Sequence, residues 1–289
     1  MVIVTSSGEV IRESVRKPAI LARHPALAAL SEPAGTIDAT VPLNYRTFEG
    51  GAGFVLGASQ HMNYYHWMIE TVPRFAWARD AGARIMLLAS PQREFHLQSR
   101  QFLFDWDPQP VALREAYYFP EILFVEPLAP TNVRLSPSIR DFYWSTRVTS
   151  SGEGIRLLVS RADARTRRLH DERALLDALA PLGFQLFSAA GHTVEEQAKA
   201  FARAEAVIGV HGAGLANLAF CRPGTCVLEI LPSSFHEGIT SYGALAELLE
   251  LRYAMYIGNA VQPNQRANSD VAVSISDVVA ATERLLSRV

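Results

Sequence analysis

Short apolar runs alternate with helical patterns along the second half of the chain. Each run is four to six residues long and is typical of a buried strand; the runs lie at 155–159, 184–187, 206–210, 226–231 and 253–257. Apolar positions with helical spacing predict helices at 171–182, 193–204, 213–221, 239–249 and 276–286. Strands that alternate with such helices indicate right-handed βαβ units. We therefore predict an α/β, Rossmann-like fold with a mostly parallel sheet for this half.

The first half is less regular. Its prolines and clustered aromatic residues predict short elements joined by turns. The segment 149–154 is small, polar and rich in glycine, which is the composition of an exposed linker. We predict two domains, 1–150 and 151–289, with the helix at 276–286 packing across them.

The strongest candidate for a binding site follows the predicted strand 206–210, at its carboxyl end. The sequence there is His211-Gly212-Ala213-Gly214-Leu215-Ala216-Asn217, and a helix of small residues begins at once. Ligands of open α/β sheets bind at such strand ends, and glycines let the backbone approach them closely. The free N–H groups of a helix N-terminus suit a diphosphate. A tight strand–helix turn capped by His211 explains the same residues equally well.

Further charged residues are expected at the same edge of the sheet. Arg161 follows the strand 155–159, and Arg165, Arg167 and Arg168 lie in the same loop. Such arginines can neutralise a phosphate, although a solvated basic loop has the same composition. Glu229, in the strand 226–231, either accepts hydrogen bonds from ribose hydroxyls or pairs with an arginine.

A polar set within an aromatic segment is the candidate for catalysis in the first half. His66 and Glu70 are four residues apart and share one face of a helix, with Asn63 as its cap. Pro73 is expected to end or kink that helix and to leave Arg74 at its tip. The pair is either a general base with its orienting partner or an internally paired helix. A metal site from His61, His66 and Glu70 is disfavoured because the HExxH arrangement is absent.

Composition narrows the function classes. The 289 residues carry 27 basic and 29 acidic side chains, a formal net charge of −2, which argues against binding nucleic acid through a broad positive field. Two cysteines exclude a disulfide framework and a CxxC site. No secretory signal or membrane-spanning stretch is apparent. We expect a cytoplasmic protein, and the sequence leaves peripheral membrane contact open.

Several blocks together resemble the family-61 glycosyltransferases. They are an HWxxExxPR block (His66, Trp67, Glu70, Pro73, Arg74), an SRxxAxxRR block (Ser160, Arg161, Ala164, Arg167, Arg168) and an HGAGLxN block (His211, Gly212, Ala213, Gly214, Leu215, Asn217), followed by Glu229. The blocks occur in the family's order over roughly residues 61 to 257. Two departures are Ala216, where a hydroxyl residue is common, and Asp171, where an asparagine is frequent.

The resemblance implies a GT-B architecture, in which two Rossmann-like domains face each other across a cleft. It implies an inverting, metal-independent transfer of a sugar from a nucleotide-sugar donor, with no further cofactor. The acceptor would be a glycan or a lipid-linked glycan, in the assembly of a bacterial surface polysaccharide or lipopolysaccharide. The resemblance places the donor on Arg161, Arg167, Arg168, Glu229 and the HGAGLxN block.

An inverting transfer needs one base to deprotonate the acceptor hydroxyl. We rank Glu70 slightly ahead of His66 for this role. Two other function classes stay open: a sugar-nucleotide epimerase or hydrolase of the same architecture, and a non-catalytic sugar-nucleotide-binding protein. Turnover without an acceptor would favour the first, and binding without turnover would favour the second.

Overall fold

The computed structural model divides the chain into two compact units, Met1–Leu128 and Ala129–Val289. It describes residues 45–47, 53–55, 62–88, 93–104, 109–112, 116–118, 121–123, 128–129, 134–146, 148, 152–235 and 241–287. The division falls before helix α4 (Pro137–Thr146), whereas the sequence places the boundary at residue 150. Helix α4 belongs to the second unit because Tyr143 packs edge-on against Phe220, with ring centroids 5.1 Å apart. Of the expected linker, residues 149–151 lie outside the described part.

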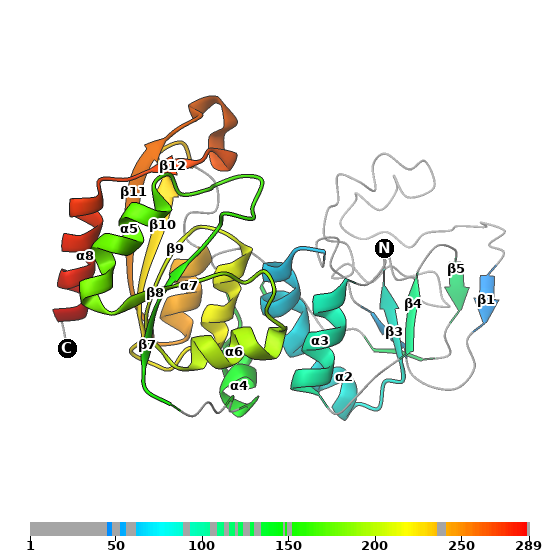
Figure 1. Cartoon of the computed structure of the whole chain (residues 1–289). Coiled ribbons are helices and arrows are strands. Elements are labelled where there is room, and N and C mark those ends of the chain that lie inside the picture. Colours follow the sequence, from blue (N-terminus) through cyan, green and yellow to red (C-terminus); the bar gives the residue numbers. More distant parts are fainter. Residues whose placement is uncertain are drawn as a thin grey trace. The chain divides into compact units, whose positions relative to one another are not determined.

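The second unit is built on a six-stranded sheet with the order β12-β11-β10-β9-β7-β8 (Figure 1). All neighbouring strands are parallel except β11 and β12, which are antiparallel. The strands are β7 (Ile155–Val159), β8 (Phe184–Phe187), β9 (Ala204–Val210), β10 (Cys226–Pro232), β11 (Arg252–Ala260) and β12 (Val271–Ala272). Every residue of β10 is buried, which is typical of a parallel strand covered on both faces.

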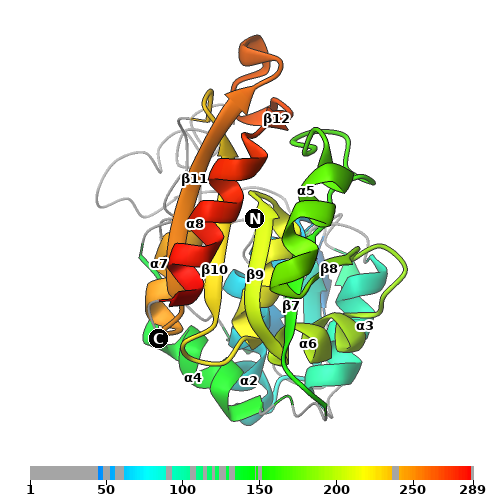
Figure 2. The same cartoon turned by 60° about the vertical axis from the view of Figure 1, so that its left-hand side comes forward.

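Helices cover both faces of this sheet. Figure 2 shows α5 (Glu172–Leu179) and α8 (Ile275–Ser287) over one face, where Leu175, Leu179 and Val278 enter the hydrophobic core. The other face carries α6 (Val194–Ala202), α7 (Ser241–Leu248) and the 3₁₀ helix η5 (Ala213–Phe220). We expected the last helix to pack across both halves; within its own unit it packs on α5, β10 and β11.

The α/β class predicted from the sequence is confirmed, and the five longer strands lie within three residues of their predicted ends. Two helices differ from the prediction. The segment expected as one helix over 171–182 ends at Leu179 and continues as a 3₁₀ turn, η4 (Ala180–Leu182), because Pro181 cannot extend an α-helix. The helix expected at 213–221 is the 3₁₀ helix η5 rather than an α-helix. The short strand β12 and the 3₁₀ helix η6 (Pro263–Asn268) were not predicted.

The first unit contains a four-stranded parallel sheet with the order β4-β3-β2-β6 and a parallel pair, β1 and β5. The strands are β1 (Tyr45–Thr47), β2 (Gly53–Val55), β3 (Ile85–Leu88), β4 (Gln109–Ala112), β5 (Ala116–Tyr118) and β6 (Ile122–Leu123). Its helices are η3 (His66–Thr71), α2 (Val72–Asp80) and α3 (Glu94–Leu103). The fully buried Trp67 joins them by packing on Phe75 and donating its indole N–H to Ser99 Oγ at 2.8 Å.

The helix that carries His66 and Glu70 has an unusual first part. Residues His66–Thr71 form a π-helix, in which the N–H of Val72 bonds to the carbonyl of Trp67, five residues back. Pro73 follows in the first turn of α2, where its missing N–H is tolerated. Of the two expectations for Pro73, to end or to kink the helix, the first is wrong, because α2 continues to Asp80; Arg74 is buried inside it and does not lie at a helix tip.

Candidate functional site

The loop between β9 and η5 is at the carboxyl edge of the second unit's sheet. The backbone N–H of His211 donates to the carbonyl of Ile230 at 2.9 Å, which continues the pairing of β9 with β10 by one residue. Gly212 follows in an extended conformation, and η5 begins at Ala213. The N–H groups at the start of η5 therefore lie at the strand end, where α/β sheets bind ligands.

His211 is held by a buried carboxylate. Oε1 of Glu229 accepts a short hydrogen bond from Nδ1 of His211, and Oε2 of Glu229 accepts one from the hydroxyl of Tyr253. Glu229 is fully buried, so these two bonds compensate for the loss of its hydration. The imidazole also contacts the rings of Phe235 and Tyr242, with centroids 4.5 Å and 5.2 Å away. Among the described residues Nε2 of His211 has no hydrogen-bond partner, so this nitrogen is available to a ligand.

Arg161 lies directly over Gly212. A Cβ atom added to Gly212 would be 1.6 Å from Nη1 of Arg161, so only glycine permits this approach. Nε and Nη2 of Arg161 donate to the carbonyls of Arg167 and Thr166, both at 3.0 Å. The hydroxyl of Tyr242 donates to the Gly212 carbonyl at 2.6 Å. The two loop carbonyls thus hold the guanidinium of Arg161, and Tyr242 holds the backbone of Gly212 against which it lies.

Two arginines of this site are half-buried, and each is partly removed from water. Burial lowers the pKa of Arg161, and the neighbouring charge of Arg167 lowers it further. Burial also lowers the pKa of Arg167, while Tyr242 and Glu229 oppose that shift. Nε of Arg167 is buried without a hydrogen-bond partner among the described residues. A bound anion would relieve the repulsion between the two guanidinium groups and would give this N–H an acceptor.

Arg167 and Arg168 take different directions although they are adjacent. Arg167 adopts a positive φ of 57°, and the chain turns there. The backbone N–H and the guanidinium of Arg168 then bind the carboxylate of Asp270, at 2.8 Å and at 3.0–3.2 Å. The structure thus places Arg168 in an ion pair with Asp270, and its place in the donor site stays a prediction.

The remaining residues of the HGAGLxN block serve the fold to different degrees. Leu215 is buried and lies 3.0 Å from the position of a Cβ atom on Gly209. Asn217 is fully buried and donates to Oε1 of Gln197 at 2.8 Å, so its amide faces the interior. Ala213 and Gly214 are half-buried at the start of η5. Of the block, the structure therefore places Gly212 against Arg161, with His211 and the first residues of η5 on either side of it in the chain.

Glu172 shapes the loop that presents Arg161. Its carboxylate accepts from the hydroxyl of Ser160 at 2.8 Å and from the backbone N–H of Arg161 at 3.2 Å. These bonds hold the end of β7 against the start of α5. Glu172 therefore positions the backbone from which the Arg161 side chain extends.

The first unit contains a second histidine–carboxylate pair. Nδ1 of His66 and Oε1 of Glu70 are 2.5 Å apart, and the side chains are 16 % and 7 % exposed. Asn63 accepts from the backbone N–H of Tyr65 at 2.9 Å, which confirms its position at the start of this segment. His66 is the more exposed member, and its Nε2 has no hydrogen-bond partner among the described residues.

The metal site and the membrane-spanning stretch considered in the sequence analysis can be compared with the described residues. His61, a member of the disfavoured metal set, lies outside the described residues. Within the described part of the chain, no three side chains of His, Cys, Asp or Glu are grouped to hold a metal ion. No described helix is both long enough and apolar enough to cross a membrane.

Comparison with known families matches residues 64–228 to the glycosyltransferase 61 model, which is more than half of the chain. The chain belongs to the glycosyltransferase 61 family. Membership supports a transferase that takes a sugar donor and an acceptor. No curated protein matches the chain.

The family match includes the His66–Glu70 pair, Arg161 and the HGAGLxN block of this glycosyltransferase, and it ends one residue before Glu229. Two site residues, Tyr242 and Tyr253, lie beyond the match, and sequence reasoning missed them. Nothing in their spacing indicates a site, because each belongs to the apolar pattern of its own element. Only the register of β10 with β11, which pairs Val227 with Tyr253, brings the phenol near Glu229.

Proposed function

We propose that this chain is an inverting, metal-independent glycosyltransferase that transfers a sugar from a nucleotide-sugar donor to a glycan or lipid-linked glycan. The proposal includes a GT-B arrangement, with the donor on the second unit and the acceptor base on the first. It assigns the enzyme to bacterial surface polysaccharide or lipopolysaccharide assembly in the cytoplasm. The family membership supports the sugar transfer, and the site geometry supports the residues assigned to the donor and to the base.

The observation that carries the proposal is a pair of half-buried arginines, of which Arg161 lies against Gly212 and Arg167 is near enough to repel it. Arg161 and Arg167 lie at a carboxyl strand edge next to the free N–H groups at the start of η5. A leaving nucleoside diphosphate gains negative charge in the transition state, and fixed cations and N–H groups stabilise that charge. These groups supply the neutralisation that a metal ion supplies in metal-dependent transferases, so we propose that no cofactor beyond the donor is needed.

The reaction is a single in-line displacement. The acceptor oxygen forms a bond to the anomeric carbon as the bond from that carbon to the diphosphate oxygen breaks, and the configuration inverts. The acceptor hydroxyl loses its proton to a base, and the diphosphate leaves with the electron pair. Arg161 and Arg167 stabilise the leaving group in this assignment.

The His66–Glu70 hydrogen bond supports an assignment of the base. A carboxylate bound to Nδ1 fixes the imidazole tautomer, so that Nε2 is the nitrogen that accepts a proton. We therefore assign proton acceptance to Nε2 of His66 and orientation of the ring to Glu70, in place of the slight preference for Glu70 stated in the sequence analysis. The greater exposure of His66 supports the same choice.

The test is a transfer assay with the purified protein, a panel of nucleotide sugars and a set of glycan acceptors, with and without a metal chelator. The expected result is acceptor-dependent release of nucleoside diphosphate that the chelator leaves intact, with proton NMR showing an inverted anomeric centre. Release without acceptor would indicate the hydrolase or epimerase alternative. Nucleotide binding without any turnover would indicate the non-catalytic alternative.

A further inference from the structure

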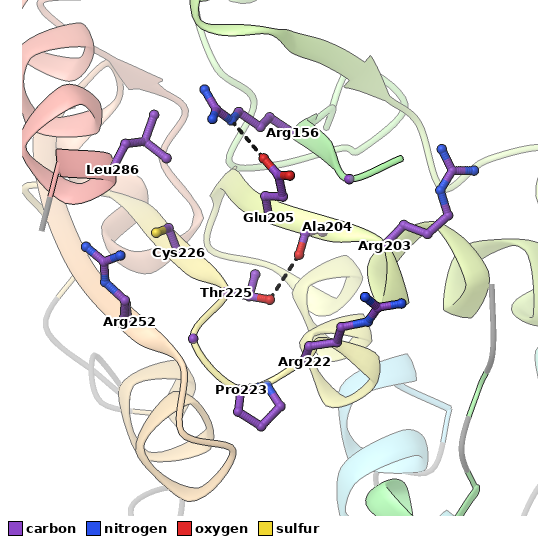
Figure 3. Close-up of a pocket in the computed structure, with 12 residues that line it drawn as sticks. Arg156, Arg203, Ala204, Glu205, Arg222, Pro223, Thr225, Cys226, Arg252 and Leu286 are labelled. Carbon is purple, nitrogen blue, oxygen red and sulfur yellow. Dashed lines mark hydrogen bonds and ion pairs between the residues drawn. The ribbon is translucent and has the colours of Figure 1, made fainter. Parts of the chain in front are cut away.

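A hollow lies at the amino-terminal edge of the six-stranded sheet of the second unit. Its volume is about 460 Å³, and it is lined by the first residues of three neighbouring strands: Ala204 of β9, Cys226 of β10 and Arg252 of β11. Figure 3 shows this hollow with Thr225 near its centre. The volume is within the range of small-ligand sites, about 300–1,000 Å³.

Arginines dominate the side chains around this hollow. Arg156, Arg203, Arg222 and Arg252 line it, and Glu205 is the one carboxylate among the lining residues. In Figure 3 the four arginine side chains surround Thr225 on several sides. The lining side chains thus have a surplus of three positive charges. An assembly of like charges around one concavity is unfavourable unless a counter-charge binds there.

The interactions of these arginines leave most of the charge uncompensated. Nε of Arg156 pairs with Oε2 of Glu205 at 3.4 Å, and its Nη1 donates to the Leu182 carbonyl at 2.7 Å. The other two bonded arginines donate to neutral carbonyls, Arg203 to Glu153 at 3.3 Å and Arg252 to Leu285. These bonds to carbonyl groups fix the positions of the guanidinium groups without cancelling their charge.

Arg222 is the cation with the fewest constraints. It is exposed, and among the described residues it has no hydrogen bond or ion pair through its side chain. It begins a turn that ends at Thr225, whose N–H donates to the Arg222 carbonyl at 3.1 Å. Gly224 occupies this turn with a φ of +83°, and its N–H donates to the Glu250 carbonyl at 2.8 Å. The turn therefore holds Arg222 at the rim while its guanidinium stays available.

The carboxylate of Glu205 lies close to the backbone of Gly154. A Cβ atom on Gly154 would be 2.1 Å from Oε1 of Glu205, so the carboxylate lies against a glycine backbone. Its other oxygen is the one that pairs with Arg156. The single carboxylate is thus paired with Arg156, and the other three lining arginines have no carboxylate partner among the described residues.

We propose that this hollow binds a phosphate group, carried by a free phosphate ester or by a phospholipid headgroup. Guanidinium groups match phosphate oxygens with paired N–H donors, and several of them surround one concavity here. The site is separate from the donor site. Strand β9 begins at Ala204 beside the hollow and ends at Val210 next to His211, and its seven residues span about 20 Å. The inference therefore does not depend on the proposed transferase chemistry.

The test compares two charge reversals at exposed arginines. Arg222→Glu changes the hollow, whereas Arg173→Glu makes the same change of charge on α5, where Arg173 is 83 % exposed and pairs with Asp177. Inorganic phosphate is titrated by calorimetry at constant ionic strength into the wild type and both variants. Loss of a charge-assisted phosphate contact is expected to weaken binding at least about tenfold in Arg222→Glu and to leave Arg173→Glu unchanged. Repeating the comparison in an Arg161→Ala background should give the same ratio, because distant sites act additively.

A second arm identifies the source of the phosphate. Sedimentation with phosphatidylglycerol vesicles, and with phosphatidylcholine vesicles as the control, is carried out on the same three proteins. Binding to phosphatidylglycerol that Arg222→Glu abolishes and Arg173→Glu retains supports a lipid headgroup. Selective weakening of inorganic phosphate without vesicle binding supports a free phosphate ester. Equal behaviour of both variants in both assays would overturn the proposal.

Discussion

Nδ1 of His211 and Oε1 of Glu229 share a hydrogen bond between neighbouring strands, although 18 residues separate them in the chain. The bond fixes the imidazole tautomer and directs Nε2 away from the carboxylate. Glu229 is in turn held by the hydroxyl of Tyr253. Burial raises the pKa of Tyr253, and the charge of Glu229 raises it further, so the phenol stays protonated and donates. These two hydrogen bonds link Tyr253, Glu229 and His211 and position His211 at the end of β9.

Removing the phenol hydroxyl should destabilise the protein. Tyr253→Phe leaves one oxygen of the buried Glu229 carboxylate without its donor, and a hydrogen bond to a charged group is worth about 1.5–3 kcal/mol. The expected result is a loss of that size in the free energy of unfolding, measured by chemical denaturation. Tyr256→Phe is the matched control, because its hydroxyl only accepts a weak bond of 3.3 Å from Ser274. An equal loss in both variants would show that the Glu229 contact contributes nothing specific.

Arg161 should contribute directly to donor binding. Arg161→Ala removes the guanidinium beside Gly212, and the affinity for a nucleoside diphosphate should fall by about 1.5–3 kcal/mol, or roughly ten- to 150-fold. Arg161→Lys keeps the charge but cannot reproduce the paired N–H donors, so an intermediate affinity is expected. Calorimetry with the folded variants measures both values. Wild-type affinity in Arg161→Ala would remove this residue from the donor site.

Gly212 and Gly214, two residues apart, allow a test of whether the position of the Arg161 guanidinium matters for binding. In Gly212→Ala the new Cβ would be 1.6 Å from Nη1 of Arg161, so the guanidinium must move. In Gly214→Ala the nearest atom to the new Cβ is Cγ1 of Val159 at 3.9 Å, which is an ordinary contact. We expect Gly212→Ala to weaken nucleoside diphosphate binding about as much as Arg161→Ala, and Gly214→Ala to have little effect.

The double variant completes this test. If Gly212→Ala acts by displacing Arg161, combining the two substitutions should cost no more than either alone, because both remove the same interaction. Additive losses in the double variant would instead mean that Gly212 contacts the ligand independently of Arg161.

The sequence predicts the strands of the second unit well because each is a short apolar run between polar turns. The buried strands β9 and β10 contain almost no polar position, and only Glu229 interrupts β10. A lone carboxylate in such a run already indicated a special environment, since a buried charge needs partners. Its partners could not be predicted, because the register between β10 and β11 decides which side chains meet.

The helix types were less predictable than the positions of the helices. The apolar spacing of residues 213–220 suits an α-helix, yet the segment forms a 3₁₀ helix. Its side chains pack against α6 and α7, so tertiary contacts decide the local conformation. The π-helix at His66–Thr71 has no propensity signal either, and Pro73 by itself predicts a helix end.

The contacts of Arg167 and Arg168 could not be predicted from the sequence either. Arg167 and Arg168 are equivalent as a pattern, but a positive φ at Arg167 directs the following residue toward Asp270. Asp270 is 102 residues away in the chain, so no local pattern could assign the pair. Sequence reasoning therefore grouped the two arginines as donor-site candidates, and it could not foresee that Arg168 pairs with Asp270.

The Arg168–Asp270 pair should make stability depend on pH. Burial raises the pKa of Asp270, but hydrogen bonds from the backbone and guanidinium of Arg168 outweigh this and leave the pKa below its ordinary value of 3.8. A carboxyl with a depressed folded pKa stabilises the protein above its unfolded pKa and loses that contribution as pH falls through the folded value. Asp270→Asn should therefore be less stable than the wild type at neutral pH, with a difference that shrinks below about pH 4.

Chemical denaturation at several pH values between about 7 and 3 measures this difference. Asp177→Asn is the control, because its exposed ion pair with Arg173 should contribute little at any pH. A difference between Asp270→Asn and the wild type that stays constant down to the lowest pH would mean that the charge of Asp270 does not contribute.

The last prediction concerns the acceptor base. If Nε2 of His66 accepts the acceptor proton, His66→Ala should lower the rate of transfer by about 10²–10⁴-fold, the usual contribution of a general base. Glu70→Gln keeps the side-chain shape but cannot stabilise the imidazolium, so its rate should fall by a smaller factor. Donor affinity should change little in either variant, because the proposed donor residues belong to the second unit. His192→Ala, which removes an exposed histidine bonded to Ser188, is the matched control.

The relative size of the two losses decides between the members of the pair. A strong loss in Glu70→Gln with a mild one in His66→Ala would return the base role to Glu70. The pH profile gives an independent check, since removing the true base abolishes the acidic limb of the profile whereas removing its orienting partner shifts that limb. Near-wild-type transfer in both variants would mean that the 2.5 Å bond between His66 and Glu70 stabilises the π-helix and takes no part in the reaction.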